Sequence, residues 1–281
     1  FDQASGTLAT IVNGDTLTTE VDCSATDADG DTITYSITSG SLPGSGLSLN
    51  SSTGFVTGTL GGSPSVGDYA FTVQAGTNKG NATRSFTITV TAPASGGTET
   101  QSGGYRIHTF NSSGTLTVPS GVTLSNVEYL IIAGGGGGAP QGGGGDNSSG
   151  GGAGGYRSSV TGVNSGGGAS AESKMTLTAG SYPVVIGGGG GDDATGSNSS
   201  FNGITSNGGG GGDSDPGGSG GGGRGSSSLS AGGSGTSGQG YNGGNPAPGG
   251  GGGGYYSGGG GGAGEAGNTD GQSEGGDGVA S

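Results

Sequence analysis

The sequence predicts an all-β protein, in which a small β-sandwich precedes a glycine-rich β domain with packed segments similar to polyglycine II helices. Two observations support this fold class. Short alternating apolar and polar runs, separated by turn residues, fill residues 1–92. Glycine then dominates, because only 13 of the 81 glycines of this 281-residue chain lie in that first part. Average glycine usage is about 7%, so the two parts require separate explanations.

The apolar residues of the first part recur at every second position, as in Thr32 to Ile37. Successive side chains of a strand point to opposite faces, so each such run has one buried face. Asp29-Gly30 and Pro43-Gly44 are typical turn sequences. We expect the core to contain Leu17, Val21, Cys23, Ile33, Tyr35, Ile37, Leu47, Leu49, Phe55, Tyr69, Phe71, Val73, Phe86, Ile88 and Val90.

Two stretches of the first part, Ala25 to Tyr35 and Leu47 to Gly54, carry a family resemblance. Together with Gly67 to Val73 and Ser85 to Val90, they resemble the bacterial "putative Ig" and cadherin-like repeats. The resemblance covers nearly all of residues 1–92 and implies an Ig-like β-sandwich. Such modules are spacers in surface adhesins, phage tail proteins and secreted enzymes, so it implies an extracellular compartment but no activity.

Asp27, Asp29 and Asp31 are weak candidates for a calcium site, because Ca²⁺ prefers clustered carboxylate oxygens. The cluster lacks the glycine and the bidentate glutamate of an EF-hand loop. The alternative is a polar turn in which aspartate side chains accept hydrogen bonds from backbone N–H groups. We therefore expect no metal and no cofactor.

Residues 93–104 are predicted to be a flexible linker, and residues 105–281 a glycine-rich domain that we expect to be truncated at its C-terminal end. Tyr105 to Phe110 and Gly114 to Val118 are expected to form a hairpin. Val127 to Ala133 is predicted to be a largely buried strand that runs directly into Gly134–Gly138. The same junction of an apolar strand and a glycine run recurs at Gly187 and Gly208.

Glycine runs normally stay disordered, because glycine loses more conformational entropy on folding than any other residue. They can become ordered when extended helices with three residues per turn pack together and bond between segments. Collagen is excluded, since glycine does not recur strictly at every third position. The apolar strands also argue against a simple flexible tether, because exposing each large side chain costs about 1.5–3 kcal/mol.

The order Tyr105 to Phe110, Tyr129 to Gly134 and Gly154 to Ser159 resembles the glycine-rich domain of bacteriophage tail proteins. Gly238 to Tyr241 and Gly276 to Ser281 continue this resemblance, which spans residues 103–281. More distantly, the glycine runs are similar to the tip adhesin of T-even-like long tail fibres, in which packed polyglycine helices present loops to the host. Unlike that adhesin, this chain begins with an Ig-like module and lacks clearly alternating hypervariable segments.

Charge excludes several partners. Six Lys and Arg residues stand against twenty Asp and Glu residues, a net charge of −14. Nucleic acid and anionic membranes need cationic side chains, so we expect neither as a partner. No run of about 18 apolar residues suggests membrane insertion. The single cysteine, Cys23, cannot form an internal disulfide. The chain starts within a strand-like sequence, and we expect it to be part of a longer polypeptide.

Catalytic patterns are weak. Several runs satisfy G-x-G-x-x-G by chance, but none leads into a helix and no G-K-[ST] follows. His108 lies in an alternating strand without a partner cysteine or a second histidine, and the carboxylates, including Asp192 and Asp193, are scattered. A glycosidase-like carboxylate pair stays open as an alternative. We expect that the chain is not an enzyme.

Tyrosine is the informative side chain of the glycine-rich part, because it offers rigid amphipathic contact area. The candidate receptor or subunit contacts are Tyr241, Asn245, Tyr255 and Tyr256; packing over glycine layers is the alternative role for these rings. The leading hypothesis is a virion structural protein, a tail fibre or appendage component for host attachment. The alternatives are a bacterial or archaeal surface adhesin or extracellular filament subunit, and a secreted enzyme with its catalytic domain elsewhere. The expected partners are copies of itself, other fibre or virion proteins, and a host surface glycan or protein, on the virion surface or outside the cell.

Overall fold

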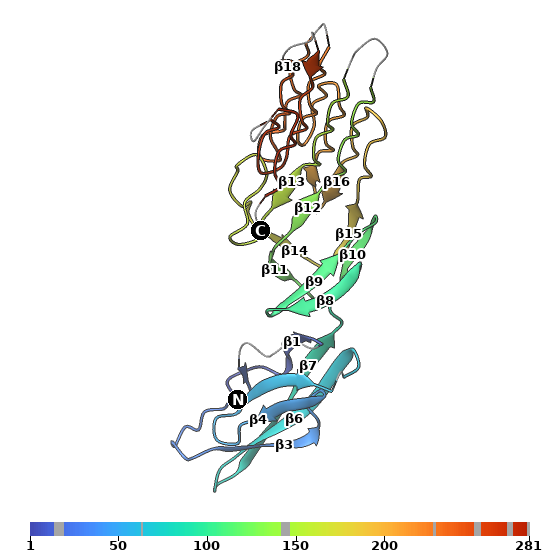
Figure 1. The fold of residues 1–281 in the computed structure, drawn as a ribbon. Coiled ribbons are helices and arrows are strands. Elements are labelled where there is room, and N and C mark those ends of the chain that lie inside the picture. The colour runs from blue at the N-terminus through green and yellow to red at the C-terminus, as the bar shows by residue number, and fades with distance from the viewer. Residues whose placement is uncertain are drawn as a thin grey trace. The chain divides into compact units, whose positions relative to one another are not determined.

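The computed structural model describes residues 1–13, 20–62, 64–141, 147–226, 229–249, 254–268 and 272–279 (Figure 1). Within these residues every regular element is a β-strand, so the all-β prediction is confirmed. The chain forms two compact units. The first contains Phe1–Ser95 with Thr117–Thr123 and Thr178–Gly180, and the second contains the remaining residues.

The first unit contains a β-sandwich of two sheets. Its seven strands are β1 (Gly6–Val12), β2 (Val21–Asp22), β3 (Thr34–Gly40), β4 (Ser45–Leu49), β5 (Phe55–Gly61), β6 (Gly67–Gly76) and β7 (Asn81–Thr91). One sheet has the order β1-β7-β6-β3 and the other β2-β5-β4. β1 pairs with β7 in parallel, whereas β6 pairs with β3 and β7 in antiparallel register. This arrangement matches the predicted Ig-like sandwich.

The sandwich core consists of the side chains that the alternation predicts. Phe71, Val73, Phe86, Ile88 and Val90 are at most 1% exposed. Strand pairing aligns several of them, because β6 and β7 place Phe71 opposite Phe86. The remaining members of the buried cluster are Ile11, Val21, Cys23, Tyr35, Val56, Leu60 and Ala75. Ile33, Ile37, Leu47, Leu49 and Tyr69 are only partly buried and pack around it. Phe55 is half-buried, and the predicted core residue Leu17 lies outside the described residues.

Three predictions for the region after Pro93 need correction. Residues 98–102 are not a flexible linker but form strand β8 (Thr98–Ser102), which pairs with β9 (Tyr105–Thr109). Consequently β9 does not form a hairpin with β10 (Gly114–Val118). β10 lies instead beside β15 (Gly180–Val185), in a sheet of order β10-β15-β16-β17. The composition of residues 93–104 is typical of a flexible linker. However, Thr98 and Thr100 favour a strand, and β9 of the same chain pairs with it.

The predicted strand from Val127 to Ala133 is interrupted. β11 (Leu124–Val127) and β12 (Leu130–Ile132) are separate, and only alternate residues are buried, because Ile131 is 7% exposed whereas Leu130 and Ile132 are about half exposed. The remaining short strands are β13 (Tyr156–Ser158), β14 (Met175–Leu177), β16 (Ser199–Phe201), β17 (Ile204–Ser206), β18 (Ala247–Pro248) and β19 (Tyr255–Tyr256). They pair as β11 with β14, β12 with β13, and β18 with β19.

Extended glycine-rich segments fill most of the second unit, and Figure 1 shows them running side by side between β12 and β18. We call them the glycine lattice and define it by these segments: 133–139, 149–155, 187–198, 207–223, 230–245, 257–268 and 274–278. Most of their recorded backbone hydrogen bonds join different segments. Backbone polar groups in the interior thus find partners without forming a conventional sheet or helix.

These hydrogen bonds recur every three residues. The antiparallel segments 133–139 and 149–155 show the period in three donor–acceptor pairs: Ala133 to Gly155, Gly136 to Gly152, and Ala139 to Ser149. N–H groups of segment 149–155 donate to two further segments with the same period. Gly150 and Ala153 donate to Gly258 and Gly261 of segment 257–268. Gly152 and Gly155 donate to Gly210 and Asn207 of segment 207–223. One segment therefore bonds to several neighbours around its axis, with about three residues per turn.

Glycine is required sterically inside this lattice. A β carbon on Gly209 would overlap the carbonyl oxygen of Gly152, and one on Gly154 would overlap that of Ala133. Both obstacles are backbone atoms, which cannot rotate away as a flexible side chain can. The buried side chains between the segments are small, as Ser206 and Ser219 show, both with 0% exposure. The segments can approach this closely because so few β carbons stand between them.

Candidate contact surface

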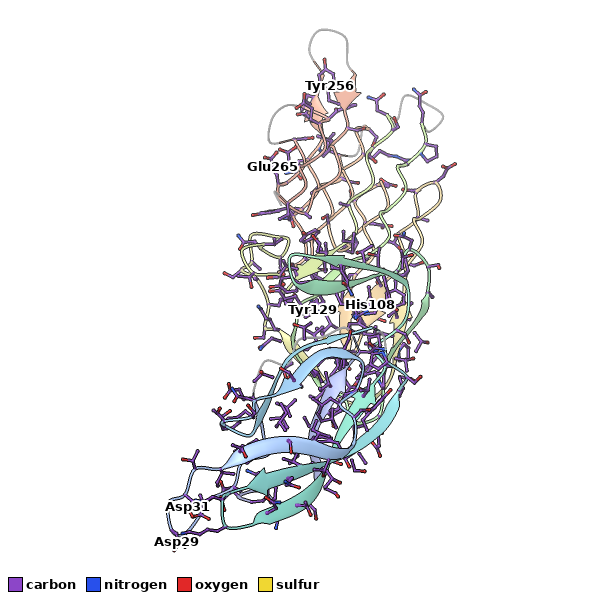
Figure 2. The ribbon with its side chains drawn as sticks, turned by 90° about the horizontal axis from the view of Figure 1, so that it is seen from below. Asp29, Asp31, His108, Tyr129, Tyr256 and Glu265 are labelled. Atoms are coloured by element: carbon purple, nitrogen blue, oxygen red, sulfur yellow. The ribbon has the colours of Figure 1, made fainter. Side chains whose placement is uncertain are left out.

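Three of the four predicted contact residues come together in one loop region. β18 and β19 pair in antiparallel fashion, with Ala247 opposite Tyr256 and Pro248 opposite Tyr255. Asn245 precedes this ribbon and is exposed. Tyr256 is 52% exposed, whereas Tyr255 is half-buried. Figure 2 shows Tyr256 at the end of the glycine lattice that lies away from Tyr129. The ribbon therefore presents one tyrosine ring to solvent.

Polar side chains from several loops hold the base of this ribbon. Asn147 donates a hydrogen bond to the carbonyl of Tyr255, and the hydroxyl of Ser257 donates to the carbonyl of Asn147 at 3.1 Å. Ser273 and Gln272 both donate to the carbonyl of Ser257, at 2.6 Å and 3.5 Å. The two contacts of Asn147 join residues that are 108 and 110 positions apart in the chain. The position of Tyr256 is thus fixed by three separate loops.

Asn245 has a structural role in this arrangement. Its side-chain oxygen accepts a hydrogen bond from the N–H of Gly232 at 2.9 Å. Its backbone carbonyl accepts hydrogen bonds from Asn268 at 2.7 Å and from Gln272 at 3.3 Å. Its side-chain oxygen and its backbone carbonyl are thus both engaged within the chain, so Asn245 supports the surface more than it forms it.

Tyr241 does not join the other three residues. Its N–H donates to the carbonyl of Gly262 and its carbonyl accepts from Gly220, so its backbone is part of the lattice. Its side chain is half-buried, and its hydroxyl lies beside Gly168. For this ring the structure matches the alternative that sequence analysis left open, namely packing against glycine.

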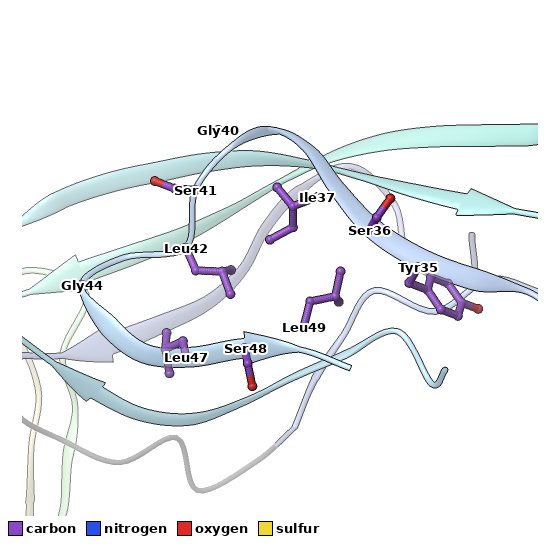
Figure 3. Close-up of a pocket in the computed structure, with 10 residues that line it drawn as sticks. All are labelled: Tyr35, Ser36, Ile37, Gly40, Ser41, Leu42, Gly44, Leu47, Ser48 and Leu49. Atoms are coloured by element: carbon purple, nitrogen blue, oxygen red, sulfur yellow. The ribbon is translucent and has the colours of Figure 1, made fainter. Parts of the chain in front are cut away.

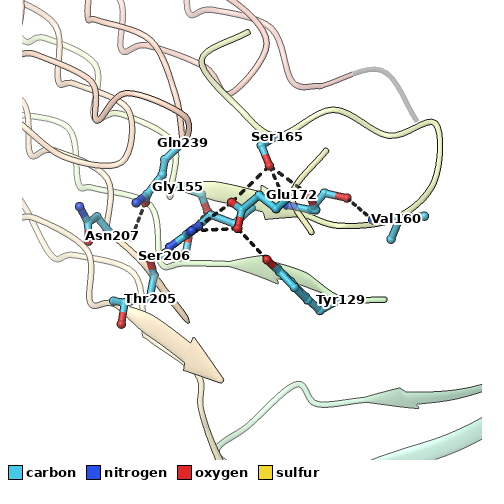
Figure 4. A network of polar contacts seen from close by, with 11 residues as sticks. Tyr129, Gly155, Val160, Ser165, Glu172, Thr205, Ser206, Asn207 and Gln239 are labelled. Atoms are coloured by element: carbon cyan, nitrogen blue, oxygen red, sulfur yellow. Dashed lines mark hydrogen bonds and ion pairs between the residues drawn. The ribbon is translucent and has the colours of Figure 1, made fainter. Parts of the chain in front are cut away.

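A second polar cluster was not predicted from the sequence (Figure 4). Arg157 of β13 contacts Glu172 through two hydrogen bonds, Nε to Oε1 at 2.7 Å and Nη2 to Oε2 at 2.8 Å. Tyr129 donates its hydroxyl to the same carboxylate at 2.6 Å, and Arg157 also donates to the carbonyl of Thr205 at 3.0 Å. The cluster fastens the long excursion between β13 and β14 to the strands beside it.

The electrostatics of this cluster favour a charged Glu172. Burial acts to raise the pKa of Glu172, but hydrogen bonds from Arg157 and Tyr129 outweigh it and hold the pKa below its usual value. Burial and the hydrogen bond to Glu172 raise the pKa of the Tyr129 hydroxyl, which stays a donor at neutral pH. The cluster is therefore structural. The only sequence signal was the rarity of charged residues in this part of the chain.

The aspartates considered for calcium form a turn. The carboxylate of Asp27 accepts hydrogen bonds from the N–H groups of Asp29 and Asp31 at 3.0 Å and 3.1 Å. Lys79 lies 3.4 Å from the Asp29 carboxylate and 2.9 Å from that of Asp31, both labelled in Figure 2. A cation of the protein itself therefore lies beside two of the three carboxylates. The described residues contain no group of three metal-ligating side chains with suitable geometry.

His108 and the candidate carboxylates lie on different elements. His108 of β9 is 13% exposed and lies 2.9 Å from the carbonyl oxygen of Gly96. Asp193 and Asp213 lie in loops of the lattice, where Asp213 contacts Arg224 at 3.5 Å. Burial, followed by the charge of Asp213, raises the pKa of Asp193.

The sandwich carries an open groove between the edge strands β3 and β4 (Figure 3). Leu42, Leu47 and Leu49 contribute its apolar side, and Ser41 and Ser48 its polar side. Tyr35 also lines the groove, but its hydroxyl is engaged by the backbone N–H and carbonyl of Ala25, both at 3.0 Å. The other lining side chains are aliphatic or hydroxylated, and none of them is an imidazole, a carboxylate or an amine.

Comparison with known protein families gives a match for the residues of the sandwich. Residues 4–91 match the protein family described as "Putative Ig domain". This match agrees with the two-sheet sandwich and with the resemblance found in the sequence, and such modules are typical of surface-exposed or adhesion-type proteins. A search of curated proteins found no match. Within the described part of the chain, no helix is long and apolar enough to cross a membrane.

Proposed function

We propose that this chain is a structural component of a tail fibre or similar appendage on a virion, and that its glycine lattice holds loops that attach to a host surface. The observation that carries the proposal is the three-residue hydrogen-bond period of the lattice. That period is the one expected of packed polyglycine II helices. The interior of such a lattice contains few side chains. The loops at its ends can therefore differ in sequence without changing the interior packing.

Rigidity links this lattice to binding. A loop that is already ordered loses less conformational entropy when it binds, so more of its contact energy becomes affinity. The ribbon of β18 and β19 meets this requirement, because Asn147, Ser257 and Ser273 fix its base. Tyr256, half exposed at its surface, supplies aromatic contact area for a sugar ring or an apolar protein side chain.

Charge narrows the class of host partner. The chain has six Lys and Arg residues, and five of them pair with a carboxylate: Lys79, Arg106, Arg157, Lys174 and Arg224. The sixth, Arg84, donates to the carbonyls of Phe1 and Gln3 and lies over the Phe1 ring. Because all six Lys and Arg side chains already have partners within the chain, none is free to pair with the negative charges of a phosphate-rich or uronic acid polymer. An uncharged glycan or a protein surface suits the ribbon better.

Catalysis is not part of the proposed function. The best-defined polar cluster, around Arg157 and Glu172, is closed by its own hydrogen bonds, and the sandwich groove holds no acid–base pair. A cellular surface adhesin or extracellular filament subunit is the second candidate, and the match of residues 4–91 to a surface-type module favours it equally well. Neighbouring baseplate or portal genes would support the virion, and secretion or sortase genes the cell.

The test is binding of the purified chain to a panel of bacterial cells, measured with a fluorescent label. Replacing Tyr255 and Tyr256 by serine should weaken binding to the cells that the wild type recognises, without changing the thermal melt. The matched control is Tyr105→Ser, because Tyr105 of β9 is equally exposed at 54% but belongs to another sheet. Equal binding by wild type and the Tyr255/Tyr256 variant contradicts the assignment of this surface.

A further inference from the structure

Segment 187–191 is an unusual edge of the glycine lattice. It consists of five consecutive glycines, and every third one faces inward: a β carbon on Gly187 or Gly190 would overlap a neighbouring carbonyl oxygen. On the outward face, Gly188 and Gly191 are exposed, and a β carbon there would meet no other atom. The fold of this chain therefore gives no steric reason for glycine at these two positions.

Other exposed edges of the lattice carry side chains at the corresponding outward positions. The exposed pairs spaced three apart are Thr195 and Asn198, Ala231 and Ser234, Asn242 and Asn245, and Glu274 and Asp277. A three-residue helix thus tolerates side chains on its solvent face. Gly275 and Gly278 are also exposed and open, but they alternate with the charged Glu274 and Asp277. Among the glycine segments that the structure describes, 187–191 is the edge that carries no side chain along its whole length.

The bare edge is only partly paired, because the carbonyls of Gly188 and Gly191 accept hydrogen bonds from the N–H groups of Ser197 and Ala194. No hydrogen bond is recorded for the N–H groups of Gly188, Gly189 and Gly191 among the described residues, whereas that of Gly190 donates to the carbonyl of Gly135. An unpaired backbone edge is a template for another chain, as at the edge of a sheet. Next to this edge, Val185 exposes 46% of its surface and adds an apolar contact.

We propose that a second copy of this chain packs against segment 187–191, with the two identical segments antiparallel and the lattice continued across the interface. A two-fold arrangement is self-complementary, since each bare edge offers the other the N–H groups of Gly188, Gly189 and Gly191 and the carbonyls that have no partner among the described residues. The geometry already exists inside the chain, where segments 133–139 and 149–155 pair in antiparallel fashion with the three-residue period.

Charge favours this antiparallel partner. Asp192 and Asp193 follow the glycine run directly and are exposed. Antiparallel packing places the aspartates of one copy at the opposite end of the segment from those of the other, so like charges do not meet. A parallel arrangement would bring all four carboxylates together, which is unfavourable in a chain of net charge −14. The segment is short compared with interfaces of roughly 1,200–2,000 Å², so the association should be weak and concentration-dependent.

The test is sedimentation equilibrium of the full chain over a wide concentration range. The wild type should dimerise, and a Gly188→Ser/Gly191→Ser variant should raise the dissociation constant about tenfold or more, because the new side chains hold the backbones apart. The variant should fold normally, since open space surrounds both positions. The matched control is Gly275→Ser/Gly278→Ser, which adds the same atoms at another open edge and should dimerise like the wild type.

Three results overturn the proposal: a wild type that stays monomeric at the highest concentration, dimerisation unaffected by the first double variant, or dimerisation abolished by the control variant instead. A Gly189→Cys variant gives an independent readout. The middle of two antiparallel segments should bring these cysteines together, so mild oxidation should produce a covalent dimer. Because the readout is self-association and not binding to cells, this proposal can fail while the host-attachment function stands, and the reverse.

Discussion

The two units of this protein form their buried cores in opposite ways. The sandwich buries large apolar side chains, and Phe71 and Phe86 pack with their ring centroids 6.2 Å apart. The glycine lattice buries backbone, and at Gly154 or Gly209 even a single methyl group would overlap a neighbouring carbonyl oxygen. In the first case the core is specified by which side chains are present. In the second it is specified by where they are absent.

The difference predicts how each unit responds to substitution. Cavity formation is the main hazard in a side-chain core, because removed atoms leave unfilled volume. Overpacking is the main hazard in a backbone core, because the obstructing carbonyl groups cannot adopt another rotamer. Deletion of side-chain atoms should therefore damage the sandwich, and addition of atoms should damage the lattice.

The largest expected effect is in the sandwich. Phe71→Ala removes a ring that is 1% exposed and should cost about 3–5 kcal/mol of the free energy of unfolding. Calorimetry of the full chain should show one transition at lower temperature and another unchanged. Val66→Ala, at a residue that is 62% exposed, is the control and should leave both transitions in place. Equal shifts of both transitions in Phe71→Ala would show that the two kinds of core are not independent.

The next effect concerns the lattice. Gly209→Ala adds one methyl group and should cost about 3 kcal/mol, the upper end for overpacking, because carbonyl oxygens of segment 149–155 surround the new atom. Gly188→Ala, at the open edge, is the matched control and should change the melt little. Limited proteolysis should show new cleavage within residues 133–278 in the first variant alone. If both variants behave alike, packing between glycine segments does not stabilise the fold.

The sequence allowed the sandwich to be predicted more fully than the lattice, for a physical reason. Alternation along a strand records burial directly, which is why Phe71, Ile88 and Val90 were placed correctly. A glycine run indicates only that side chains are absent, and it does not indicate which segment lies beside it. Which segments become neighbours depends on loop geometry, so the pairing of segments 133–139 and 149–155 left no pattern in the residues.

The contact surface, too, could be predicted only in part from the sequence. Asn245, Tyr255 and Tyr256 were named as candidate contacts together with Tyr241, and the ribbon of β18 and β19 places Tyr255 and Tyr256 opposite the residues that follow Asn245. Tyr241 looked equivalent in sequence, but its side chain is half-buried and its hydroxyl lies beside Gly168. Spacing along an extended segment does not say which tyrosine rings are exposed. The ion pair of Arg157 and Glu172 was invisible for the same reason, since the two residues meet through a loop of irregular structure.

The Arg157 and Glu172 cluster offers a sharper comparison, because there a charged group fastens segments of the second unit through several hydrogen bonds. Glu172→Gln should cost about 2 kcal/mol at neutral pH, since Arg157 and Tyr129 lose a charged acceptor. The folded-state pKa of Glu172 lies below its ordinary value of 4.5, so its contribution is present above that value and is lost as pH falls through the lowered pKa. The gap between variant and wild type should therefore close in strongly acidic solution.

The control for this experiment is Glu99→Gln, because the ion pair of Glu99 with Arg106 is longer, at 3.5 Å, and more exposed. Surface pairs of this kind contribute about 0–1 kcal/mol. Equilibrium unfolding at several pH values, followed by a probe of the second unit, gives both numbers. A difference between Glu172→Gln and wild type that does not depend on pH would mean that shape, and not charge, matters at this position.

The smallest expected effect is that of metal removal. In the turn after Ala25, the carboxylate of Asp27 already accepts two backbone N–H groups, and Lys79 neutralises Asp29 and Asp31. Calcium binding would have to displace that ammonium group and break a turn whose hydrogen bonds are satisfied. Melts of the full chain with calcium and with a chelator should therefore superimpose for both units.

Lys79→Ala sharpens the test, because it removes the competing cation while leaving the carboxylates in place. A calcium-dependent rise in the sandwich transition of the variant alone would show that Lys79 takes the place of the ion, whereas such a rise in the wild type would contradict the assignment of this turn.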